Sequence, residues 1–79
     1  MPESDTVVVF KILGVLAKAP ALVVDEIADA LRLGKPRVEH YMVVLQQAGA
    51  VRAEAGPSHP PAYSLTRYGL GRLVEGRAH

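Results

Sequence analysis

Apolar residues recur every three or four positions between Thr6 and Lys18, a spacing that predicts an amphipathic helix. Pro20 follows and is expected to end this helix, because proline lacks a backbone N–H. The apolar positions fall on two faces of the helix. The face expected to pack on the core comprises Val9, Phe10, Leu13, Leu16 and Ala17. The face expected to contact another subunit comprises Val8, Ile12 and Val15. In so short a chain, a helix that is apolar on two faces predicts a homodimer.

A short extended bridge over residues 22–24 precedes a second, shorter helix. Asp25 and Glu26 open that helix, because negative charge is favourable at the positive end of a helix dipole. Gly34 is expected to stop it. Its apolar stripe comprises Ile27, Ala28 and Leu31.

A third helix is predicted over 35–48, with Pro36 tolerated in its first turn and Gly49 closing it. Its apolar stripe comprises Val38, Tyr41, Met42, Leu45 and Ala48. Two short helices joined by a turn that contains glycine form a helix-turn-helix. The segment from about Val24 to Gly49 is therefore predicted to be one.

Beyond Gly49 the pattern changes to that of a β-hairpin. A strand is expected over 51–55, a turn or loop over 56–61 and a returning strand over 63–66. Thr66 can then cap a last helix that carries Leu70, Leu73 and Val74. The predicted fold class is mainly α with a small β-hairpin (α+β), as one domain over residues 1–79. The order is helix, short strand, helix, helix, strand, strand, helix.

Composition and charge limit the function classes. The 79 residues are 49% hydrophobic, which is enough for one core but not for an enclosed substrate cavity as well. There is no cysteine, so disulfides and thiolate metal sites are excluded. No apolar stretch is long enough to span a bilayer, and we expect a cytoplasmic protein without a membrane partner. The net charge is only +1, yet residues 32–52 carry four cations and a single carboxylate.

Two stretches resemble the winged helix-turn-helix of the MarR, PadR and IclR regulator families. The first is DEIADALRLGKPRVEHYMVVLQQAGAVRAE, and the second is AYSLTRYG. The positions that match the families' pattern are Ile27, Ala28, Leu31, Leu45, Gly49 and Val51, then Tyr63, Leu65, Thr66 and Gly69. The resemblance implies a sequence-specific DNA-binding transcription regulator that acts as a homodimer, with 35–48 as its reading helix and 51–66 as its wing.

The residues expected to contact double-stranded DNA are cations and hydrogen-bonding side chains of the reading helix and wing. They are Lys35, Arg37, His40, Gln47, Arg52, His59 and Arg67. The guanidinium of Arg37 can bond two acceptors of one guanine, whereas Lys35 and Arg52 suit phosphates. The residues expected at the dimer interface are Val8, Ile12, Val15, Leu70, Leu73 and Val74.

Three departures from the families' pattern support an alternative. Glu39 puts a carboxylate on the reading helix, and Val43 and Val44 are apolar where polar or basic residues are usual. The wing tip, residues 56–61, has no lysine or arginine and only His59 as a basic residue. The alternative is a winged-helix module that binds a protein partner through Val43 and Val44. The histidines are scattered and no phosphate loop or metal motif is present. We therefore expect no enzymatic activity, metal site or cofactor.

Overall fold

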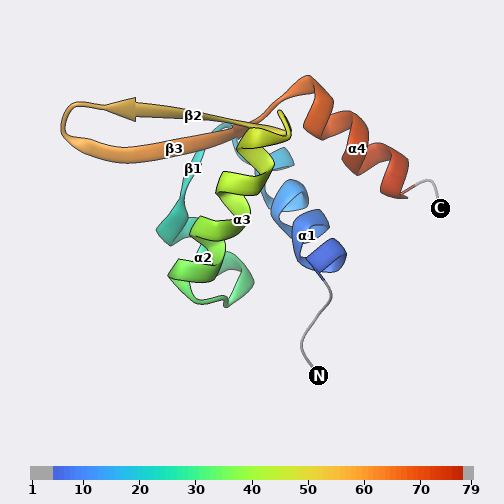
Figure 1. The fold of residues 1–79 in the computed structure, drawn as a ribbon, viewed down its shortest axis with the longest axis horizontal. Helices are drawn as coiled ribbons and strands as arrows, with labels where there is room; N and C mark the ends of the chain where they lie inside the picture. Colours follow the sequence, from blue (N-terminus) through green and yellow to red (C-terminus); the bar gives the residue numbers. More distant parts are fainter. Residues whose placement is uncertain (1–4, 78–79) are drawn as a thin grey trace.

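The computed structural model describes residues 5–77, within which four helices accompany a three-stranded antiparallel sheet (Figure 1). The elements in chain order are α1 (Asp5–Ala17), β1 (Leu22–Val23), α2 (Val24–Leu31), α3 (Lys35–Gln47), β2 (Val51–Gly56), β3 (His59–Leu65) and α4 (Arg67–Arg77). The predicted fold class and element order are confirmed. The hairpin tip and α4 lie at opposite ends of the longest axis, which measures 41 Å (Figure 1).

Side chains and backbone conformation close both ends of α2. At its start, the Val23 N–H donates to Oε1 of Glu26 over 3.0 Å, as the predicted acidic opening requires. At its end, Arg32 adopts the left-handed conformation with φ 56°. The prediction that Gly34 stops this helix was therefore wrong. Gly34 has an extended φ of −66° and precedes α3, where its carbonyl accepts from the Arg37 and Val38 amides.

Arg32→Gly is expected to stabilise the domain by about 0.5–1 kcal/mol. The left-handed conformation costs a residue with a Cβ about 1–2 kcal/mol, and glycine is largely free of this cost. The melting temperature should rise by several degrees, measured by circular dichroism. Arg32→Ala is the control, because it removes the same charge and keeps the Cβ. An equal rise in Arg32→Ala would assign the gain to charge instead.

The sheet has the order β1-β3-β2, so β3 pairs on both sides. Val51 lies opposite Leu65 and Ala53 opposite Tyr63, which confirms the predicted antiparallel hairpin. The loop predicted over 56–61 was wrong in extent, since β2 reaches Gly56 and β3 begins at His59. Three prolines in this segment favoured a loop in the sequence. Pro57 lies in the turn. Pro60 and Pro61 fit in β3 because β1 pairs only with residues 62 and 63, and the β2 register shifts between Glu54 and Gly56.

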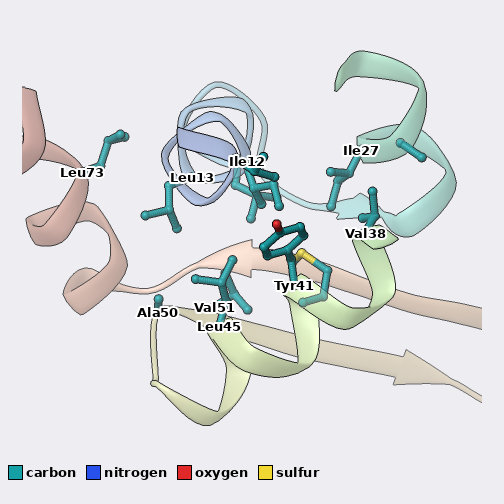
Figure 2. Packing of buried hydrophobic residues seen from close by; sticks show 13 residues of the cluster. Ile12, Leu13, Ile27, Val38, Tyr41, Leu45, Ala50, Val51 and Leu73 are labelled. Atoms are coloured by element: carbon teal, nitrogen blue, oxygen red, sulfur yellow. The ribbon is translucent and has the colours of Figure 1, made fainter. Parts of the chain in front are cut away.

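The core lies where the four helices and the sheet meet, and Figure 2 shows these elements contributing side chains to it. Val8 and Ile12 are 2% and 0% exposed, so their assignment to a dimer interface was wrong. Leu73 is 3% exposed and its assignment there was wrong as well. The reason is that α1 contacts α2, β3 and α4, which cover the face that the sequence left for a partner. Ala17 of the predicted core stripe is exposed.

Three hydrogen bonds hold the base of the hairpin, and two of them join the two stretches that resemble winged-helix regulators. The Thr66 hydroxyl donates to the Gly49 carbonyl over 2.6 Å and accepts from the Gly69 amide over 3.0 Å. The Thr66 amide donates to the Ala50 carbonyl over 3.0 Å. Thr66 therefore caps α4 as predicted. Gly49 closes α3 with a φ of 82°, also as predicted.

Candidate nucleic-acid interface

The outward face of α3 is fixed by the residues that α3 buries on its other side. Its buried side chains are Val38, Tyr41, Met42 and Leu45. At about 100° per residue, the positions opposite them form an exposed ridge. This ridge comprises Pro36, His40, Val43 and Gln47, all of them exposed. Because its buried side is anchored in the core, α3 presents the ridge as a rigid surface.

The first turn of α3 carries a cation that is already paired. Nζ of Lys35 lies 3.0 Å from Oδ1 of Asp25 in α2, and both side chains are more than half exposed. The hydrogen bond and the charge of Asp25 raise the pKa of Lys35 above its ordinary value. Lys35 therefore stays protonated, but the carboxylate beside it offsets part of its attraction for a phosphate.

Tyr41 organises the side chains on the flank of the ridge. The Arg37 guanidinium lies 5.9 Å from the centre of the Tyr41 ring, and the His40 ring meets the same ring edge-on at 5.9 Å. The Tyr41 hydroxyl donates to Oδ1 of Asp5 over 2.6 Å. Sequence reasoning gave Tyr41 only a place in the core. The spacing of four residues from Arg37 was the available signal, because such positions are neighbours on a helix.

The hairpin residues that were predicted to contact DNA lie apart from those on α3. Arg52 lies 3.5 Å from Glu54 and alternates with Val51 and Ala53, so it occupies the hairpin face turned away from the core. His59 folds back at the tip, where its Nδ1 lies 3.1 Å from the Pro60 carbonyl. Arg67 is exposed at the start of α4. The predicted DNA contacts therefore divide into one group on α3 and separate positions on β2, the tip and α4.

A groove of about 360 Å³ lies between α3, strand β3 and the junction of β1 with α2. Its lining comprises Val23, Val24, Asp25, Lys35, Glu39, Val43, Pro60, Pro61 and Tyr63. Val44 instead lines a second hollow of about 320 Å³, against Phe10 and Tyr68. The two valines, expected to serve one partner together, thus face different hollows.

Two further findings concern only residues 5–77. No three His, Asp or Glu side chains gather there as ligands of a metal ion would. None of the helices in that range combines the length and the apolar character needed to cross a membrane.

Comparisons with solved structures define the fold. A MarR family transcription regulator superposes with a TM-score of 0.82 at 24% identity, over 91% of this chain and 49% of that one. A point mutant of Lactococcus lactis ZitR gives 0.80 at 21% identity, over 100% and 57%. The apo Zα domain of zebrafish PKZ gives 0.75 at 21% identity, over 80% and 97%. The chain thus spans about half the length of the first two proteins.

Neither a protein-family model nor a curated protein sequence matches the chain. The likeness therefore rests on structure. The chain has the winged helix-turn-helix fold and is similar in it to MarR-type regulators.

Proposed function

We propose that this chain is a sequence-specific, DNA-binding transcription regulator that acts in the cytoplasm without a cofactor or enzymatic activity. The observation that carries the proposal is the exposed ridge of α3, anchored on its opposite side by buried residues and placed next to a hairpin wing. A reading helix of this kind enters the major groove of DNA. The structural similarity to a MarR family transcription regulator supports the same function.

In this proposal the contacts divide into base reading and backbone holding. Arg37 stands in the first turn of α3 and is long enough to reach a guanine, with His40 and Gln47 following along the ridge. Lys35, Arg52, His59 and Arg67 hold phosphates or sugars. Such contacts set affinity, whereas base contacts set sequence preference.

Arg37→Ala is expected to reduce the preference for the target over random DNA by about 1–3 kcal/mol. Lys35→Ala is the matched variant, and it should weaken binding to all sequences alike while leaving that preference intact. Fluorescence anisotropy at two salt concentrations measures both quantities. The DNA comes from selection out of a random duplex library. Unchanged binding by both variants would contradict placing α3 in the groove.

Asp25→Asn is expected to raise DNA affinity about three- to tenfold. The substitution releases Lys35 from its 3.0 Å ion pair and removes a negative charge beside the bound phosphates. The slope of log affinity against log salt should become steeper by about one unit. Asp29→Asn, an exposed carboxylate on the same helix, is the control and should change affinity less. Equal effects of the two variants would show that only net charge matters.

We also propose a homodimer through α1 and α4. Val15 is half-buried, and Leu70 and Val74 are 47% and 57% exposed, so these three of the predicted interface residues stay accessible. A hollow of about 540 Å³ lies between the two helices next to Val15. Because α4 and the hairpin tip are at opposite ends of the molecule, a partner at α4 leaves the tip accessible to DNA (Figure 1).

One observation favours a second candidate function, a protein-interaction module. Val44 and Tyr68 are 44% and 56% exposed and both line the hollow of about 320 Å³ beside Phe10. Exposed apolar side chains around a hollow are typical of protein-binding surfaces. This candidate predicts negligible retention on a column of unrelated DNA at low salt, where a DNA-binding regulator is retained.

A further inference from the structure

Val43 occupies the centre of the ridge that the proposed function turns toward DNA. It is 51% exposed, compared with 44% for Val44, and lies opposite the buried side of α3. An isopropyl group makes no hydrogen bond to a phosphate or to a polar base edge. In the major groove, the apolar group that a protein can contact is the C5-methyl of thymine.

The walls of the groove around Val43 agree with an apolar contact. From the hairpin, Pro60, Pro61 and Tyr63 line it. The two prolines have no backbone N–H to offer to a phosphate. Lys35 also lines this groove, but its ammonium group is held by Asp25.

Glu39, one helical turn before Val43, also suits a base edge better than a phosphate. It is exposed, lines the same groove and repels phosphates, so it does not suit a backbone-holding surface. The ion pair of Lys35 is with Asp25 and not with Glu39. At base edges, a carboxylate can accept from the amino group of cytosine.

We infer that Val43 reads the methyl group of a thymine and that Glu39 accepts a hydrogen bond from the amino group of a nearby cytosine. This inference rests on the proposed function and names the bases that α3 selects. Four residues rise about 6 Å along a helix, close to two base-pair steps of about 3.4 Å. The two pyrimidines therefore lie within about two steps of each other in the target. The residues that are unfavourable for holding phosphates become the residues that confer specificity.

The test uses the full chain and the duplex that it selects from a random library. Each thymine of that duplex is replaced in turn by deoxyuridine, which lacks only the methyl group. At the thymine that Val43 contacts, the wild-type chain should lose about three- to tenfold in affinity. Val43→Ala should bind the thymine and deoxyuridine duplexes equally. Val44→Ala, the neighbouring valine that faces the other hollow, should keep the wild-type difference.

A second arm tests Glu39. Glu39→Gln should lose the preference for cytosine at the paired position in a repeated selection, while the thymine preference remains. Both residues are exposed, so the variants should fold, and circular dichroism checks this.

The results of the two arms separate the inference from the proposed function. A selected sequence without any deoxyuridine penalty, or a penalty that Val43→Ala retains, overturns the inference and leaves the regulator function standing. An unchanged cytosine preference in Glu39→Gln overturns the role of Glu39. A wild-type chain that selects no sequence at all overturns the proposed function, and the inference with it.

Discussion

Gly69→Ala is expected to destabilise the domain by about 3 kcal/mol, at the upper end of the cost of overpacking. A Cβ at this position would lie 2.1 Å from the Ala50 carbonyl oxygen and 2.9 Å from Cδ1 of Leu65. The carbonyl cannot move aside easily, because it accepts the Thr66 amide at 3.0 Å. The substitution therefore pushes α4 away from the hairpin base or breaks that hydrogen bond. Urea denaturation followed by circular dichroism measures the loss.

Gly71→Ala is the matched control, two residues further along the same helix. Gly71 is exposed and its Cβ position has no atom within 4 Å. Alanine there should stabilise α4 by about 0.5–1 kcal/mol, because glycine is a poor helix former. Opposite signs for the two glycines would confirm the close approach of α4 to Ala50. Stabilisation by both substitutions would show that α4 does not pack there.

Features that depend on neighbouring residues were predictable from the sequence. Pro36 lies in the first turn of α3, Gly49 closes that helix with a positive φ, and Thr66 caps α4. Each of these is set by local backbone chemistry, which a short stretch of sequence contains. Alternation along β3 likewise places Tyr63 and Leu65 on one face, and both pack against the core.

Features that depend on distant elements were not predictable in the same way. A helical wheel shows that α1 is apolar on two faces, but not which elements cover each face. α4, which is far from α1 in the sequence, packs on it and buries its own Leu73 there. The sequence likewise predicted a short extended segment at β1, but not its pairing with Tyr63 and Ala62, which adds a third strand to the hairpin. Two residues are too few to show which strand they pair with.

The candidate site shows the same division. The residue types on α3 follow from its period, whereas the ion pair of Lys35 depends on how α2 and α3 cross. The pair of Arg52 and Glu54 was open to prediction, because residues two apart on a strand share a face. Pairing changes the expected function of these cations, since each one brings a carboxylate close to the DNA phosphates.

Ile12→Glu is expected to unfold the domain. Ile12 is 0% exposed and belongs to the cluster that joins α1 to α3 and α4 (Figure 2). A carboxylate there loses its hydration. Among the residues that the structure describes, no charged side chain belongs to this cluster, so none can compensate the buried charge. The cost should exceed about 4 kcal/mol, close to the whole stability of a domain of this size. Far-UV circular dichroism at 25 °C should show loss of helix.

Val74→Glu makes a comparable change at a position on α4 that is 57% exposed. It should keep the helical spectrum and shift stability by no more than about 0.5 kcal/mol within the monomer, as surface substitutions do. Sedimentation at tens of micromolar should then change from a dimer for the parent to a monomer for this variant. A folded, soluble Ile12→Glu chain would instead show that Ile12 lies at the surface. The first expectation, that this face of α1 belongs to the dimer interface, would then be correct. A parent chain that sediments as a monomer at this concentration would contradict the proposed dimer, and the exposed residues of α4 would then not be an interface between two copies.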